Sequence, residues 1–249
     1  MILYHYTNLD TLYSIIKNIN TENANSIYFT LRATHAYFLN DMTEGQLLLA
    51  ALKKIGADEN LLYNLTSIMG YPFVVSLSEL EDDLNMWRCY ANQGKGVSIG
   101  LNKDVIEEAI KHQPWGESAA INKCQYVTED ELVEHLKSLH IKESIQDPDK
   151  KPLCTLLLKT LKFKNKSFIA EEEWRIYANC LESDLRVSDN LIIPYYNIQL
   201  PIEAITSITF GPKCDFPKNR FSTYRLLKAI IGDKRATKID LKQSIIPLI

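Results

Sequence analysis

Two short apolar runs, at residues 73–77 and 97–101, limit the ways in which this 249-residue chain can fold. Each run is rich in valine, isoleucine and leucine and has the length of a buried strand. The amphipathic segment 82–92 lies between them and leads into the turn Gly94-Lys95-Gly96. We therefore expect a strand, a short helix and a sharp turn back into the same sheet.

The rest of the sequence alternates between strand and helix patterns. β-branched and aromatic runs predict further strands at 2–6, 26–31, 123–127, 172–178, 191–196, 205–210 and 237–241. Apolar residues at helical spacing predict helices at 9–18, 44–55, 59–69, 103–112, 129–142, 152–163 and 220–231. This order predicts one α+β domain spanning residues 1–249, with a mixed or antiparallel sheet, flanking helices and a helical insertion.

Composition is that of an ordinary globular protein, with 46% hydrophobic and 24% charged residues. No apolar run approaches the roughly 20 residues that cross a membrane, and the N-terminus lacks the pattern of a secretory signal. The five cysteines are scattered, without a CxxC pair or a histidine at zinc spacing. We therefore expect reduced thiols in a cytoplasmic protein, no membrane partner and no metal.

Charge is unevenly distributed along the chain. From Gly211 onward there are nine Lys and Arg residues against three Asp, so this end carries +6 while the preceding part carries −9. A basic end of this kind can face an anionic partner such as a nucleotide or nucleic acid. The same charges also suit a solvated helix face.

Acidic residues and an arginine alternate along the late strand. In an extended segment Glu171, Glu173 and Arg175 share one face, and Trp174 and Ile176 share the other. The Trp/Ile face suits the core, so we expect the Glu/Glu/Arg face to point to solvent or into a cleft. Paired carboxylates beside an arginine can do acid/base work or stabilise a cationic transition state. They also suit a solvated strand face with an ordinary ion pair.

Aromatic and basic residues supply candidate ligand contacts. His5 and Tyr6 lie on a predicted inner strand, where an imidazole can hydrogen-bond a ribose or phosphate or serve a purely structural role. Helical spacing puts Trp87 and Tyr90 on one side of the segment 82–92, where they either fill the core or stack on a base. Arg88 offers a fork of donors to phosphate or carboxylate.

Glycines at the end of this segment permit close approach of a ligand to the backbone at Gly94-Lys95-Gly96. The spacing from Gly94 through Gly96 to Gly100 misses the dinucleotide fingerprint by one residue, and it opens a strand instead of a helix. A Rossmann site is therefore excluded. The chain also has no Walker A sequence, nucleophile elbow or kinase signature.

Several stretches together resemble a bacterial family, the domain of unknown function numbered 2971. They are LYHYT at 3–7, FLNDMTEG at 38–45, SLSELEDDLNMWRCYANQGKGVSIGL at 76–101, KCQYV at 123–127, FIAEEEWRI at 168–176 and ITFGPKC at 208–214. The Met-Trp-x-x-Tyr and Glu-x-Glu-Trp-Arg segments are the most specific of these. The family name carries no activity, so this resemblance bears on the fold.

The order of the elements is also similar to that of the ADP-ribosyltransferase superfamily: a His-Tyr strand, a capped helix, a Tyr-Phe strand, a Ser-x-Ser strand and a late glutamate strand. The resemblance implies NAD as cofactor, with His5 on the ribose and Tyr28 or Tyr37 stacked on nicotinamide. Glu173 or Glu171 would then stabilise the positive charge that develops on the ribose. A role in toxin or phage-defence biology would follow.

Two functions remain open from the sequence. The first is an NAD-dependent ADP-ribosyltransferase-like enzyme acting on nucleic acid or protein, with His5, Glu171 and Glu173 as catalytic residues. The second is a non-catalytic module that binds nucleotides or nucleic acid. The expected cofactor contacts are His5, Tyr6, Tyr28, Tyr37, Trp87, Arg88, Tyr90 and Arg175.

Overall fold

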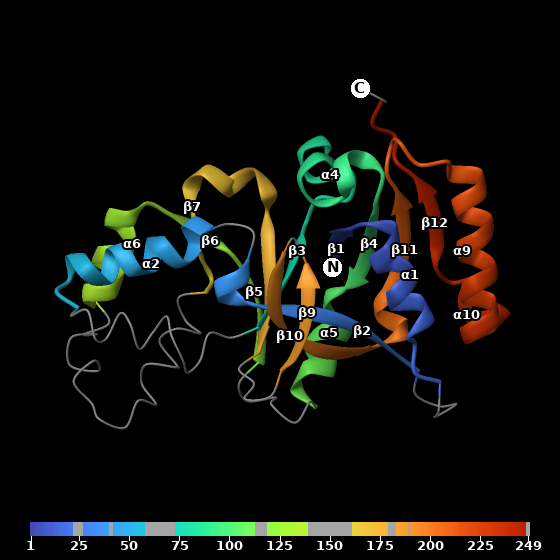
Figure 1. The fold of residues 1–249 in the computed structure, drawn as a ribbon, viewed down its shortest axis with the longest axis horizontal. Coiled ribbons are helices and arrows are strands. Elements are labelled where there is room, and N and C mark those ends of the chain that lie inside the picture. The colour runs from blue at the N-terminus through green and yellow to red at the C-terminus, as the bar shows by residue number, and fades with distance from the viewer. Residues whose placement is uncertain are drawn as a thin grey trace. The chain divides into compact units, whose positions relative to one another are not determined.

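A computed structural model describes residues 1–21, 27–39, 42–57, 73–112, 119–138, 161–178, 183–188 and 190–247 (Figure 1). Contacts group the chain into two compact units. Unit 1 comprises Met1–Leu31, Ser76–Gly116 and Asn197–Ile249, and unit 2 comprises Arg32–Val75 and Glu117–Tyr196. The strands β2 (Tyr28–His35), β3 (Phe73–Ser78) and β10 (Leu191–Pro201) have residues in both units. The expectation of one domain over the whole chain stays a prediction.

Unit 1 is built around the buried strand β4 (Val97–Asn102). It pairs antiparallel with β1 (Ile2–Thr7) and with β11 (Ile205–Phe210), and β12 (Asp240–Gln243) adds parallel to β11. The helices of the unit are α1 (Leu9–Lys17), α4 (Leu84–Tyr90), α5 (Lys103–Lys111), α9 (Phe216–Ile231) and α10 (Asp233–Ala236), with the 3-10 turns η2 (Asn92–Gly94) and η5 (Ile202–Ala204). The expected strand, helix, turn and strand at 73–101 are confirmed.

Unit 2 contains short strand pairs and a helix pair. The strand β5 (Ala119–Lys123) is antiparallel to β8 (Glu173–Ala178), β9 (Asp184–Ser188) is antiparallel to β10, and β6 (Gln125–Val127) is parallel to β7 (Phe163–Asn165). The helices α2 (Met42–Lys54) and α6 (Glu129–Ser138) pack through a core that includes Leu48, Leu52, Leu132 and Leu136. The 3-10 turns are η1 (Ala36–Phe38) and η4 (Lys166–Glu171).

The predicted α+β class is confirmed, because helices accompany a mixed, mostly antiparallel sheet. Some boundaries differ. The strand expected at 26–31 extends to His35, where it pairs with β3. The last long helix begins at Phe216 because the Asp215 carboxylate accepts the Lys218 N–H at 3.2 Å and caps it. Phe163, expected in a helix, begins a strand, and β9 was not predicted. The expected helix at 59–69, most of 152–163 and the segment 143–151 lie outside the described residues.

Gly96, just before β4, and Gly211, just after β11, allow two stretches of backbone to approach each other closely. A Cβ at Gly96 would lie 2.1 Å from the Thr7 carbonyl oxygen, and one at Gly211 would lie 2.5 Å from the Gly94 carbonyl oxygen. The Gly211 N–H donates to Gly96 O, and the Lys213 N–H donates to Gly94 O, each at 2.9 Å. The close approach expected for a ligand is therefore made by the protein's own backbone.

Gly96→Ala is expected to lower the free energy of unfolding by about 2 kcal/mol, because the added methyl group forces the backbone apart. Urea denaturation followed by circular dichroism measures the change. Lys95→Ala is the control, since the Lys95 side chain is exposed in the same turn. It should change the free energy of unfolding by no more than about 0.5 kcal/mol. Equal effects of the two substitutions would contradict the packing argument.

Candidate functional site

Four charged side chains of unit 2 form one group, which we call the charge cluster: Lys164, Glu171, Glu173 and Arg175. Arg175 binds Glu173 with two parallel hydrogen bonds, from Nε to Oε1 at 2.9 Å and from Nη2 to Oε2 at 3.0 Å. Lys164 Nζ donates to Glu173 Oε2 at 2.8 Å and to Glu171 Oε2 at 2.5 Å. The two cations and two carboxylates balance, so the cluster is neutral.

Local structure positions each member of the charge cluster. Lys164 is the middle residue of β7, and Glu171 ends η4. Glu172 then takes a left-handed conformation with φ 43°, which ends the turn and lets β8 begin at Glu173. The Glu173 N–H donates to the hydroxyl of Tyr126 at 2.8 Å. The two carboxylates therefore reach one lysine from different elements instead of lying along one strand.

The charged face of β8 is buried, which corrects the expectation that it points to solvent or a cleft. Lys164, Glu173 and Arg175 are 3%, 4% and 1% exposed, whereas Trp174 on the opposite face is partly exposed. Burial alone would raise the pKa of the Glu173 carboxyl, but the Arg175 and Lys164 cations outweigh it and lower this pKa to about 2. Glu173 is therefore a carboxylate at neutral pH, and both of its oxygens hold cations.

Stability should fall in acid because of Glu173. Its pKa drops from an ordinary 4.5 to about 2 on folding, so the unfolded chain binds the proton first. The stabilisation is complete above about pH 5 and is lost as the pH falls toward 2. Melting temperatures measured from pH 6 to pH 3 should therefore fall less steeply for Glu173→Gln than for the wild type. If the melting temperatures of the two proteins fall equally with pH, Glu173 does not contribute to the acid dependence of stability.

Tyr6 and Trp87 of unit 1 form a second group. Their rings meet edge-on with centroids 4.9 Å apart, and Trp87 is fully buried. The Trp87 indole N–H donates to Asp82 Oδ1 at 2.5 Å, and this carboxylate also accepts the Ser244 hydroxyl at 2.7 Å and the Ile245 N–H at 2.8 Å. Trp87 thus fills the core, and through Asp82 it is linked to Ser244 and Ile245. Its ring has no exposed face for stacking on a base.

The other residues predicted to form a site are spread over both units. His5 of β1 is half-buried, and its Nδ1 donates to the Ser76 carbonyl at 3.1 Å. Burial lowers the pKa of His5 below its ordinary value. Arg88 is exposed on α4, while Tyr90 beside it and Tyr28 of β2 are half-buried. Tyr37 lies in η1, and its side chain is outside the description.

The structure therefore brings together Glu171, Glu173 and Arg175 in unit 2, and Tyr6 and Trp87 in unit 1. His5 belongs to unit 1, and each unit is described by itself. Sequence reasoning missed Lys164, which completes the charge cluster. It is one of three lysines in the run 162–166, and no local pattern marks it as the buried one.

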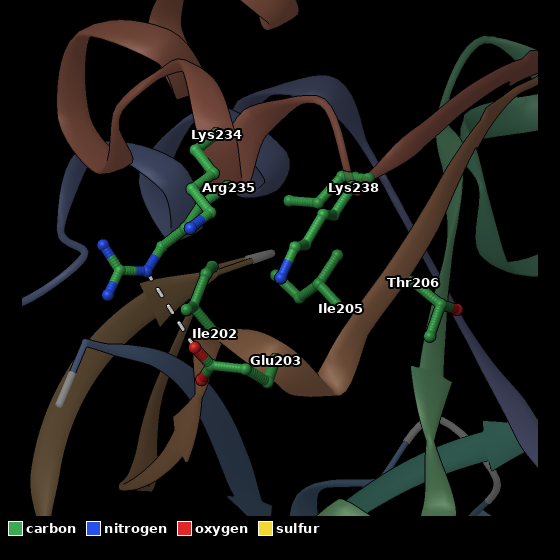
Figure 2. A pocket seen from close by; sticks show the side chains of 8 residues that line it. Ile202, Glu203, Ile205, Thr206, Lys234, Arg235 and Lys238 are labelled. Carbon is green, nitrogen blue, oxygen red and sulfur yellow. Dashed lines mark ion pairs between the residues drawn. The ribbon is translucent and has the colours of Figure 1, made fainter. Parts of the chain in front are cut away.

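A pocket of about 620 Å³ lies in unit 1, beside α10 (Figure 2). Lys234 and Arg235 of α10, together with Lys238, surround it, and Glu203 of η5 supplies its carboxylate. Its lining also contains Ile202, Ile205, Thr206 and Ile239. The sequence pointed to this region only through the excess of basic residues after Gly211.

Three side chains around the pocket are cationic, and only one is acidic. The Nε of Arg235 lies 4.0 Å from Glu203 Oε1, which is a loose ion pair at the surface. Among the described residues, Lys234 and Lys238 form no ion pair, and both are exposed. The three isoleucines are buried, at 3% to 6% exposure. The arrangement can hold an anionic group at its rim and an apolar group against its floor.

The described part of the chain contains no helix that is long and apolar enough to cross a membrane. No group of three or more His, Cys, Asp or Glu residues in this part of the chain is placed to hold a metal ion.

Comparison with known proteins gives one match. Neither the curated proteins nor the solved structures include a match to the chain. The segment that matches, residues 86–176, contains most of α4, all of β4 and the whole charge cluster, but it leaves out the stretches at 3–7, 38–45 and 208–214. Over this segment the chain matches the family described as a protein of unknown function (DUF2971).

Proposed function

We propose that this protein binds nucleotides through the pocket beside α10. One observation carries the proposal: Lys234 and Lys238 stand without ion partners, among the described residues, at a pocket whose floor is apolar. Ammonium groups bind phosphate through charge-assisted hydrogen bonds. Mostly apolar pockets with a few placed polar groups are the usual form of small-molecule sites. The cytoplasmic location expected from the sequence is part of this proposal.

Lys234→Ala/Lys238→Ala is expected to weaken nucleotide binding at least about tenfold, because it removes both unpaired cations from the rim. Calorimetry with ATP, AMP, NAD and adenosine measures the effect, and the three phosphate-bearing ligands should bind more tightly than adenosine. Lys213→Ala/Lys218→Ala is the matched control, since it removes the same charge outside the pocket. Equal binding of adenosine and ATP, or equal loss in the control, would contradict the proposal.

ADP-ribosyl transfer from NAD is a second candidate, and the ionisation of Glu173 favours it. A carboxylate that stays charged at neutral pH can stabilise the positive charge that develops on the ribose. In the charge cluster Arg175 and Lys164 occupy both oxygens of Glu173. Substrate would therefore have to displace one of these cations, which makes nucleotide binding the better-supported function.

Labelled NAD, supplied with RNA, single-stranded DNA and cell lysate as acceptors, tests the second candidate. Transfer of the label or release of nicotinamide should be lost in Glu173→Gln. It should survive in Glu172→Gln, whose carboxylate, within the described part of the chain, is recorded in one ion pair, a surface contact of Oε2 with Lys123 Nζ at 3.9 Å. If the wild-type protein releases no nicotinamide, the transferase hypothesis is wrong.

A further inference from the structure

Helix α9 carries basic residues without any acidic ones: Lys218, Arg220, Arg225 and Lys228. The lysines near its ends are compensated from outside the helix. Lys218 Nζ lies 2.7 Å from Asp215 Oδ2, and Lys228 Nζ lies 2.9 Å from Asp233 Oδ1. Arg220 and Arg225 are exposed, and the described residues give neither an ion pair. The uncompensated charge of α9 is therefore concentrated in its middle.

An exposed aromatic ring lies between these two arginines in the sequence. Phe221 is 63% exposed, and the Arg225 guanidinium lies 5.6 Å from the centroid of its ring. Leu227 and Ile231 bury the side of α9 that faces the core. Packing therefore does not account for Phe221, which presents its ring to solvent beside the Arg225 guanidinium, with the exposed Arg220 one residue before it in the helix.

We propose that Arg220, Phe221 and Arg225, which we call the α9 face, bind single-stranded nucleic acid. Guanidinium groups bind backbone phosphates bidentately, and an aromatic ring stacks on a base of any sequence. A single strand supplies both groups at once, whereas the bases of a duplex are already stacked on one another. A two-fold contact of this face with the same face of a second copy is disfavoured, because it would bring arginine against arginine.

The α9 face is independent of the nucleotide pocket, since the two share no residue. Variants of the α9 face should therefore weaken binding of the single strand, whereas variants of the pocket should weaken binding of nucleotides. Phe221 separates base stacking from charge, because its removal leaves the positive charge of α9 unchanged.

Fluorescence anisotropy of a labelled single strand of about 12 nucleotides tests the proposal with the full-length protein. Phe221→Ala should weaken binding about tenfold, and Phe221→Tyr should retain it because the ring remains. Arg220→Ala/Arg225→Ala should weaken binding of both the single strand and inorganic polyphosphate. Phe221→Ala should leave polyphosphate binding unchanged, because that polymer has no bases.

Lys234→Ala/Lys238→Ala is the matched control, since it removes two charges from the pocket and none from the α9 face. It should retain at least half of the wild-type affinity for the single strand. Wild-type affinity in Phe221→Ala, or tighter binding of a duplex of the same length, would overturn the proposal. A larger loss from the pocket variant than from the α9 variants would do the same and would place the polymer at the pocket.

Discussion

Arg175→Met is expected to lower the free energy of unfolding by about 3–5 kcal/mol. Arg175 is 1% exposed and makes two hydrogen bonds to Glu173, and its Nη1 donates to the Leu161 carbonyl at 2.8 Å. Its removal leaves the buried Glu173 and the partly exposed Glu171 sharing the single cation of Lys164. An uncompensated buried charge is far more costly than the loss of a surface ion pair.

Urea denaturation followed by far-ultraviolet circular dichroism measures this change. Lys123→Met is the control, because Lys123 is about half exposed and lies 3.9 Å from Glu172; it should cost less than about 0.5 kcal/mol. The double variant Glu173→Gln/Arg175→Met should be less damaging than the sum of the single variants, since it leaves Lys164 paired with Glu171. Additive losses would show that the members of the charge cluster do not depend on one another.

Trp87→Ala is expected to cost about 3–5 kcal/mol, the range for truncating a large side chain in a core. The substitution removes the edge-on partner of Tyr6. It also removes the N–H donor to Asp82, which anchors Ser244 and Ile245. The segment that follows β12, residues 244–246, should therefore become less protected together with α4.

Circular dichroism serves here as well, because it does not depend on tryptophan emission. Phe221→Ala in the same unit is the control, and at an exposed position it should change stability by no more than about 0.5 kcal/mol. Hydrogen exchange of the amides of 244–246 should increase in Trp87→Ala. If stability is retained and exchange is unchanged, Trp87 does not hold the chain end in place.

Strands and helices of this protein were largely predictable, because each is encoded by a local repeat of apolar residues. The runs at 73–77 and 97–101 predicted β3 and β4, and helical spacing predicted α1 and α5. Boundaries were less accurate where a distant partner decides them. The strand β2 continues to His35 because β3 pairs with it there.

The sites were less predictable than the fold. Alternation correctly placed Glu173 and Arg175 on one face of a strand, yet the face proved to be buried, because Lys164 arrives from β7 to neutralise it. Helical spacing placed Trp87 and Tyr90 on one side of α4, but only the contacts of Tyr6 and Asp82 made Trp87 a core residue.

Local pattern thus determines which segments become strands and helices, because main-chain geometry repeats every two or 3.6 residues. Burial and pairing of charge depend on contacts between segments far apart in the chain. Lys164 and Lys234 look alike in the sequence, yet Lys164 is buried against two carboxylates and Lys234 stands at the rim of a pocket. Tertiary structure alone decides which lysine stabilises the fold and which remains available to a ligand.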